Sequence, residues 1–326
     1  MEWTGCDLCG ADDTVLVFHA TDTNTHLSGV FSIVQCCQCH LVYLNPRPDQ
    51  HEIQRYYPEN EYFCFEMEAE PPRLGQDDPL LRVIRELDLA VTSLCDVGCG
   101  TGRFLLAAQR TGWQVAGIEP HDRARGLCNA RLDGRVVFSS FERARFPAGA
   151  FDVVTFWHAL EHLPSPRAAL GECHRILRTG GLLALAVPNF QSLERRVWGA
   201  NWIGVMAPTH LFHFTRSTLR RYLETSGFEI VAESQPPGAN SLAANVLRSL
   251  RRLFLDPLSK AGDGSRGSPS AGTGIGAEKQ AASHYAIAGS TKARALWLTT
   301  RFVYPLAWLV AQSGLGPELR LYARKA

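Results

Sequence analysis

Residues 93–102 read Ser-Leu-Cys-Asp-Val-Gly-Cys-Gly-Thr-Gly, a short apolar strand that runs into a glycine-rich turn. Glycines at 98, 100 and 102 let the backbone turn tightly and approach a ligand where a side chain would collide. About seventeen residues after this turn, the next strand-like segment ends in Glu119, whose carboxylate can accept hydrogen bonds from both hydroxyls of a ribose. The combination predicts a nucleotide-binding site at the edge of a parallel sheet.

The spacing of the glycines indicates which kind of nucleotide is bound. A dinucleotide fingerprint has its third glycine three residues after the second, and that position here is Arg103. The third glycine falls at residue 102 instead. The loop is therefore not expected to hold a pyrophosphate.

Strand-like and helical segments alternate around this loop. This order predicts an α/β fold with a doubly wound, mostly parallel sheet. The expected strands are residues 93–97, 114–118, 135–138, 151–156, 182–187, 228–233 and 318–324, and the expected helices are residues 79–89, 103–111, 167–177 and 217–226.

Two segments together resemble a known enzyme class. The glycine loop is similar to the first motif of class I S-adenosylmethionine-dependent methyltransferases, and the stretch 151–188, with Phe-Asp-Val-Val-Thr-Phe-Trp-His-Ala-Leu-Glu-His-Leu and Arg-Thr-Gly-Gly-Leu-Leu, resembles the central part of the same class. The resemblance implies a Rossmann-like seven-stranded sheet whose last two strands form an antiparallel hairpin. It also implies cofactor contacts by Asp96, Gly98, Cys99, Gly100, Gly102, Glu119, Pro120, Ser140, Phe141 and Trp157.

The chain departs from this class at one position. Many relatives carry an aspartate for the adenine amino group just after the third strand, where this chain has Ser140, Phe141 and Glu142. The Ser140 hydroxyl or the Phe141 backbone is the expected substitute.

Four cysteines near the start have metal-ligand spacing. Cys6 and Cys9 form one CxxC pair, and Cys36 and Cys39 form another after strand-like sequence at 14–19 and 30–35. Two such knuckles facing each other provide the tetrahedral sulfur site that Zn²⁺ prefers, so we expect a small zinc ribbon with a structural metal. Cys37 and His40 are spare candidates. Their simpler interpretation is that Cys37 follows a ligand and that His40 occupies the turn position often held by glycine.

The segment after the second knuckle has a resemblance of its own. It is similar to the cysteine-rich segment found ahead of some bacterial small-molecule and sugar methyltransferases, in which a tyrosine-rich stretch lies over the cofactor pocket. The alternative is that these rings pack the ribbon against the next domain. The rings are Tyr56, Tyr57, Tyr62, Phe63 and Phe65.

Several ionisable side chains are expected on the acceptor side of the site. Methyl transfer requires an aligned acceptor and, for a hydroxyl or carbon acid, removal of a proton. Histidine titrates near neutrality and suits the second task. Taken singly, each histidine fits a structural role better than a catalytic one, so the hypothesis depends on the set. The candidates are His158, Glu161, His162, His210 and His213; we expect His158 and Glu161 to line the site and His210 to act as base.

The last third of the chain predicts an insertion in the hairpin. About eighty residues separate its two strands, with apolar segments at 242–258 and 295–310 and a Gly/Ser-rich stretch at 261–276. The second apolar run is shorter than the ~20 residues that span a bilayer. Two interpretations stay open: a helical pair packed on the domain or on a second copy in a homodimer, or a surface anchor at residues 242–312 that contacts a membrane.

Composition limits the functional classes. The 326 residues carry a formal charge of +1, which argues against nucleic acid as a partner, and the first residues lack a secretory signal, which predicts a cytoplasmic protein, either free or peripheral to a membrane. The expected segments are 1–48 (zinc module), 49–78 (connector), 79–240 (methyltransferase core), 241–316 (insertion) and 317–326 (last strand).

The resulting hypothesis is an S-adenosylmethionine-dependent methyltransferase that modifies a small-molecule acceptor, a sugar or another secondary metabolite, at oxygen or carbon. Two alternatives accompany it. One is an RNA methyltransferase whose ribbon holds RNA, and the other is a non-catalytic cofactor-binding scaffold.

Overall fold

The computed structural model describes residues 1–25, 27–58, 79–87, 90–132, 137–238, 242–243, 245–246, 300 and 303–326. The expectations for Tyr62, Phe63, Phe65, residues 66–78 and most of the insertion lie outside these residues.

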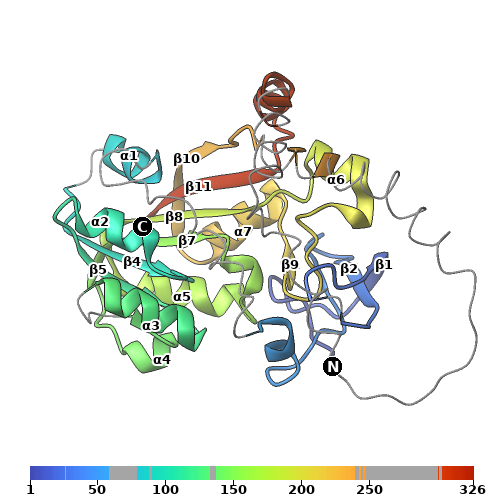
Figure 1. Ribbon diagram of the computed structural model, residues 1–326, viewed down its shortest axis with the longest axis horizontal. Helices are drawn as coiled ribbons and strands as arrows, with labels where there is room; N and C mark the ends of the chain where they lie inside the picture. Colours follow the sequence, from blue (N-terminus) through green and yellow to red (C-terminus); the bar gives the residue numbers. More distant parts are fainter. Residues whose placement is uncertain are drawn as a thin grey trace, which may run out of the picture.

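The larger sheet has seven strands in the order β10-β11-β8-β7-β4-β5-β6 (Figure 1). Neighbours from β8 to β6 are parallel, whereas β11 runs antiparallel to β8 and to β10. This confirms the predicted α/β doubly wound fold and its terminal hairpin. The strands are β4 (Ser93–Val97), β5 (Gln114–Ile118), β6 (Val137–Phe138), β7 (Phe151–Trp157), β8 (Leu177–Pro188), β10 (Phe228–Ser234) and β11 (Glu318–Lys325).

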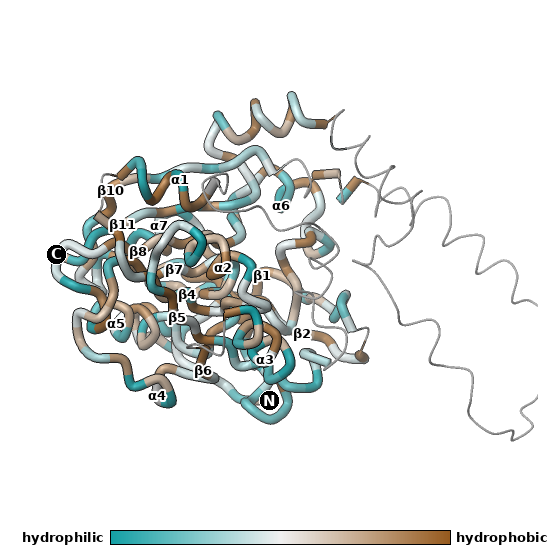
Figure 2. Tube along the Cα trace, turned by 60° about the vertical axis from the view of Figure 1, so that its left-hand side comes forward, coloured by the Kyte–Doolittle hydropathy of each residue, from teal (hydrophilic) through white to brown (hydrophobic). Residues whose placement is uncertain are grey.

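Helices cover both faces of this sheet because its strands are apolar on both faces. Successive residues belong to different buried clusters: Leu94 to the cluster that contains residues of α1 and α2, and Cys95 to the cluster that contains residues of α5 and α7. Apolar residues accordingly concentrate along the central strands (Figure 2). The helices are α1 (Pro79–Glu86), α2 (Arg103–Gln109), α3 (Asp122–Arg131), α4 (Phe141–Ala144), α5 (Pro166–Ile176), α6 (Leu193–Trp198) and α7 (Arg216–Thr225).

A second, antiparallel sheet belongs mainly to the N-terminal module, residues 1–48. Its order is β1 (Thr14–Ala20), β2 (Phe31–Cys36), β3 (Val42–Leu44) and β9 (Phe212–His213). Strand β9 is distant in sequence from the other three strands. It pairs with β3, with Tyr43 opposite Phe212 and Val42 opposite His213. The module therefore lies directly against the core, beside β9 (Figure 1).

Among the described residues, no helix has the length and apolar character that crossing a bilayer requires.

Candidate active site

A cavity of about 1720 Å³ opens at the carboxyl ends of β4, β5 and β7. This is where a doubly wound sheet binds its ligands. Nine of the ten expected cofactor residues line it; Gly102 is the exception. The nine are Asp96, Gly98, Cys99, Gly100, Glu119, Pro120, Ser140, Phe141 and Trp157.

The glycine loop takes its shape from close packing as well as from the cavity. Gly98 has a φ of 76°, and a Cβ there would lie 2.5 Å from the Cβ of Ala159. Gly102 has a φ of 81°, and a Cβ there would lie 2.2 Å from the sulfur of Cys128. Both positions therefore exclude a side chain, and the bare loop passes along the cavity wall.

Glu119 is buried at the end of β5 and holds two turns together. Its Oε2 accepts a hydrogen bond from Gly100 N at 2.8 Å, and its Oε1 accepts one from His121 N at 2.8 Å. Burial raises the pKa of Glu119, and these two bonds partly offset the rise. Each carboxylate oxygen retains a second lone pair, so the group still suits a pair of ribose hydroxyls.

Asp96 is a buried acid that also lines the cavity. It accepts a hydrogen bond of 2.6 Å from the Thr155 hydroxyl. Burial raises the pKa of Asp96 to about 7; the Thr155 bond opposes this rise and the charge of Glu119 adds to it. A buried carboxyl of this kind is suited to the positive charge of a cationic ligand.

The other cofactor candidates surround these acids. Ser140 is the N-cap of α4, since its hydroxyl accepts from Arg143 N at 3.4 Å. The ring of Trp157 packs edge-on against Phe104 at 5.4 Å. Among the described residues, the buried Nε1 of Trp157 has no acceptor, which leaves a donor available to a ligand.

His158 lies at the mouth of the cavity as part of an ion pair. Its Nε2 is 3.0 Å from Glu318 Oε2 of β11, and its Nδ1 is 3.5 Å from Glu161 Oε1. Burial opposes the charge, but Glu318 and Glu161 outweigh it and raise the pKa of His158 to about 10. The imidazole is therefore protonated at neutral pH and has no lone pair with which to accept a proton.

His162 also lines the cavity, but its surroundings favour the neutral imidazole rather than the charged one. Its Nδ1 lies 2.9 Å from the carbonyl of Thr209 and 2.9 Å from the hydroxyl of Tyr57. Because the carbonyl only accepts, Nδ1 carries the proton and Nε2 keeps the lone pair. Burial lowers the pKa of His162, so the ring is neutral at pH 7.

Glu161, His210 and His213 lie behind this wall and do not line the cavity. The Nδ1 of His210 is 2.9 Å from the carbonyl of Gly204, and its Nε2 is 4.0 Å from Glu161 Oε1. Burial lowers the pKa of His210 and brings that of His213 to about 3. Glu161, His162 and His210 each present one ligand-type atom within 4.8 Å of the others.

The four cysteines converge at the knuckles of the N-terminal module. Their sulfurs lie within 4.8 Å of one another, with Cys6 and Cys39 at 3.3 Å and Cys9 and Cys36 at 3.5 Å. Four sulfurs about 2.3 Å from one ion would be roughly 3.8 Å apart, so the arrangement fits Zn²⁺.

The two knuckles repeat one backbone pattern. Gly10 N donates to Cys6 O, and His40 N donates to Cys36 O, with positive φ angles of 79° and 61°. His40 thus occupies the glycine-like turn position, as expected, and the exposed Cys37 lies outside the cluster.

Two groups of residues at the site could not be predicted from the sequence. Arg47, Gln50 and Gln54 line the cavity from the N-terminal side, and Glu318, in the last strand, pairs with His158, which lines it. None of these side chains has a residue type or spacing that by itself points to a site. They meet the core only through folding, so no local pattern marks them.

Comparisons with known proteins agree with this geometry. A family model described as a methyltransferase domain matches residues 50–233. A ubiquinone biosynthesis O-methyltransferase of Aromatoleum aromaticum is 30% identical over 200 residues, which cover 57% of this chain and 85% of that protein. One from Xanthomonas oryzae pv. oryzae is 35% identical over 141 residues, or 40% of this chain and 59% of that protein. The chain belongs to the methyltransferase domain family and is an S-adenosylmethionine-dependent methyltransferase.

The chain is also similar to solved structures. A SAM-dependent methyltransferase from Archaeoglobus fulgidus aligns with a TM-score of 0.44 at 19% identity, over 81% of this chain and 99% of that one.

Proposed function

We propose that this methyltransferase transfers a methyl group to a hydroxyl oxygen of a small molecule. The observation that carries the proposal is that one cavity is lined both by the buried acids Asp96 and Glu119 and by the histidines His158 and His162. The names of the relatives, O-methyltransferases of ubiquinone biosynthesis, support oxygen as the methylated atom. A sugar or another hydroxylated secondary metabolite is the proposed acceptor.

The cofactor residues act by binding and orientation. Bound S-adenosylmethionine supplies an activated methyl group on a sulfonium. Glu119 accepts from the ribose hydroxyls, Asp96 faces the positively charged end, and the loop from Gly98 to Gly102 lies along the ligand. Ser140, Phe141 and Trp157 enclose the remaining side. Alignment of acceptor and donor then provides much of the rate.

His162 is assigned the removal of the proton from the acceptor hydroxyl. Of the two histidines that follow β7 and line the cavity, His158 and His162, only His162 is neutral at pH 7, with a lone pair on Nε2. His158 stays charged, with its two N–H groups directed at Glu318 and Glu161, and contributes a fixed positive charge beside the acceptor. His210 and Glu161, behind the wall, support His162 rather than meeting the acceptor. His213 is buried further from the cavity and has a structural role in this proposal.

The metal of the N-terminal module is proposed to be structural Zn²⁺, held by Cys6, Cys9, Cys36 and Cys39. Four protein ligands close the coordination sphere and leave no position for a substrate. The segments 1–48, 49–78, 79–240, 241–316 and 317–326 are kept as the proposed division of the chain.

A separate proposal is that the segment before β11 makes peripheral contact with a membrane. Tyr304, Leu306, Trp308 and Leu309 are exposed apolar side chains in this part of the chain. Flotation with liposomes, with and without residues 242–312, tests the contact. Equal soluble fractions would contradict it.

Labelled S-adenosylmethionine, supplied with a panel of phenols, sugars and nucleotide-linked sugars, tests the proposed reaction. We expect an O-methylated product, and His162→Gln should lower kcat by about 100-fold or more because a general base contributes that much. His174→Gln, in α5, is the matched control. Transfer to carbon only, transfer to RNA, or full activity of His162→Gln would each contradict the proposal.

A further inference from the structure

Asp7 connects the zinc knuckle to the core. It lies between Cys6 and Cys9, and its carboxylate points away from the sulfurs and into the core. Oδ1 accepts a hydrogen bond of 2.6 Å from the Ser165 hydroxyl. Oδ2 accepts from Arg167 N and from the Tyr222 hydroxyl, each at 3.0 Å.

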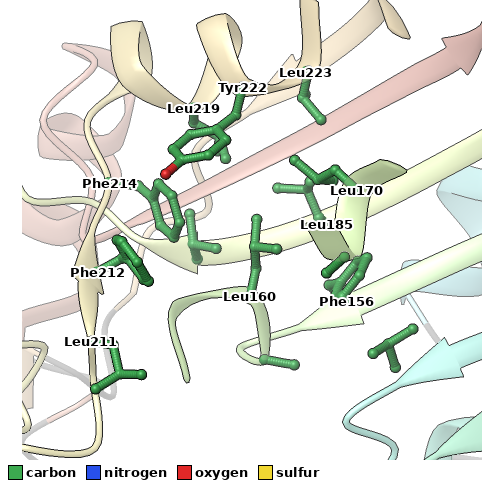
Figure 3. Close-up of a cluster of buried hydrophobic side chains, with 14 of the residues drawn as sticks. Phe156, Leu160, Leu170, Leu185, Leu211, Phe212, Phe214, Leu219, Tyr222 and Leu223 are labelled. Carbon is green, nitrogen blue, oxygen red and sulfur yellow. The ribbon is translucent and has the colours of Figure 1, made fainter. Parts of the chain in front are cut away.

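These partners belong to the N-terminus of α5 and to a buried side chain of α7. Ser165 is the N-cap of α5, and Arg167 N is one of the amides that an α-helix leaves unpaired in its first turn. A carboxylate at this position is also favoured by the helix dipole. Tyr222 comes from α7 and is fully buried in the apolar cluster between that helix and the sheet (Figure 3).

Three further contacts hold the chain just before α5. Arg47 Nη1 donates to the Pro164 carbonyl at 2.7 Å, and the Tyr57 hydroxyl lies 2.9 Å from His162 Nδ1. Leu44 N, in β3, donates to the carbonyl of Leu211, whose own N donates to the carbonyl of Glu161, both at 2.9 Å. The N-terminal module and the adjoining turn at residue 57 thus hold the segment 161–167 at four places.

The segment 161–167 is the larger part of the acceptor wall, the name used here for residues 158–167. His158, His162, Leu163, Pro164 and Ser165 all line the cavity. The cofactor loop touches this wall where Gly98 packs against Ala159, but its other supports lie in the core. Gly100 is held by Glu119, and Gly102 packs against Cys128, so the cofactor side is braced from within the core.

We infer that Asp7 is a positioning residue through which the zinc knuckle fixes the acceptor wall, while the cofactor side stays independent of the metal. The knuckle fits zinc by its sulfur geometry, and the metal would fix the backbone from which Asp7 projects. Loss of the metal or of the Asp7 carboxylate releases Ser165 and Arg167 and loosens the wall that carries His162. The inference rests on the proposed function only in calling residues 158–167 the acceptor wall; the contacts of Asp7 do not depend on that function.

Hydrogen exchange read by mass spectrometry tests the inference without any acceptor. In zinc-loaded Asp7→Ala, amides of residues 158–167 should exchange roughly tenfold faster or more, because a charged hydrogen-bond acceptor is lost. Amides of residues 94–102 should change less than about twofold, and titrated S-adenosylhomocysteine should bind with unchanged affinity. Chelation of zinc from the wild-type protein should give the same local pattern.

Two further variants make the result interpretable. Asp7→Asn keeps one acceptor oxygen and should give a smaller increase than Asp7→Ala, and Asp13→Asn, an exposed acid of the same module, should give none. Unchanged exchange at 158–167 in Asp7→Ala would overturn the inference, as would equal acceleration at 94–102. Neither result would bear on methyl transfer, which the acceptor panel tests separately.

Discussion

His158 and Glu318 form an ion pair with 3.0 Å between Nε2 and Oε2, although 160 residues separate them in the sequence. His158 follows β7, and Glu318 begins β11, which reaches the site because it pairs with β8. Together with Glu161, the contact raises the pKa of His158 to about 10, so this histidine of the acceptor wall is charged at neutral pH. His162, three residues after Ala159, is left as the neutral imidazole on that wall.

Replacing Glu318 by glutamine should return His158 toward ordinary titration. The carboxylates of Glu318 and Glu161 raise the pKa of His158 to about 10, so His158 should remain protonated at pH 8 in the wild-type protein. In Glu318→Gln its pKa should fall. Nitrogen-15 NMR of the histidine rings gives both values, and a wild-type His158 that titrates at its ordinary pKa of 6.5 would contradict the account.

The same pair predicts a pH window for stability. His158 has a raised pKa, so its contribution is full below pH 6.5 and is lost as the pH rises through about 10. Glu318 has a pKa lowered to about 2, although burial opposes this, so its contribution is full above pH 4.5 and is lost as the pH falls toward 2. The loss of Tm in Glu318→Gln should therefore be largest between pH 4.5 and 6.5. A loss that grew above pH 10 would have the wrong sign.

Gly98→Ala should destabilise the protein more than Gly112→Ala. Both glycines have positive φ angles, 76° and 91°, so each substitution costs about 1–2 kcal/mol of backbone strain. Only at residue 98 does the added Cβ meet a neighbour, Ala159 at 2.5 Å, which adds roughly 1–3 kcal/mol of overpacking. Urea unfolding of both variants measures the difference. Equal free energies of unfolding would show that the loop can move away from Ala159.

Metal analysis should find zinc bound to the four-cysteine cluster. Cys36→Ser removes one thiolate and should abolish zinc binding, whereas Cys37→Ser changes an exposed residue outside the cluster and should retain it. Elemental analysis after dialysis measures both. Zinc retained by Cys36→Ser would place the metal elsewhere, and Glu161, His162 and His210 are then the set to examine.

The raised pKa of Asp96 predicts that cofactor binding releases protons near neutral pH. Burial raises its pKa to about 7, so part of the population is protonated before binding. A cationic ligand favours the carboxylate, and the affinity should therefore rise between pH 6 and 8. Calorimetry in two buffers of different ionisation enthalpy counts the protons released. Asp96→Asn should show no such release, and a wild-type protein that releases none would refute this role.

Much of the fold could be predicted from local patterns. The strand at 114–118 has the predicted bounds, and the hairpin of β10 and β11 forms across the insertion as expected. Strand β9 could not be predicted, because two residues carry no periodicity and their partner Tyr43 lies far away in the chain. Helix α3 was also missed, since its charged residues obscure an apolar face on which Ala124 and Cys128 are buried.

The site follows the same division. The proximity of the glycine loop and Glu119 could be predicted from their spacing, because both lie at strand ends of one sheet. It could not distinguish His158 from His162, since their protonation depends on Glu318 and on the Thr209 carbonyl, both remote in sequence. The burial of His210 likewise depends on a loop held by the N-terminal module.

Calorimetric titration of the zinc-loaded protein with S-adenosylmethionine tests the central claim most directly. The account predicts about one cofactor per chain, with affinity lowered roughly tenfold or more in Glu119→Ala, because a charged hydrogen-bonding partner is lost, and little changed in His162→Gln. Absence of binding by the wild-type protein, or equal affinity in Glu119→Ala, would contradict it.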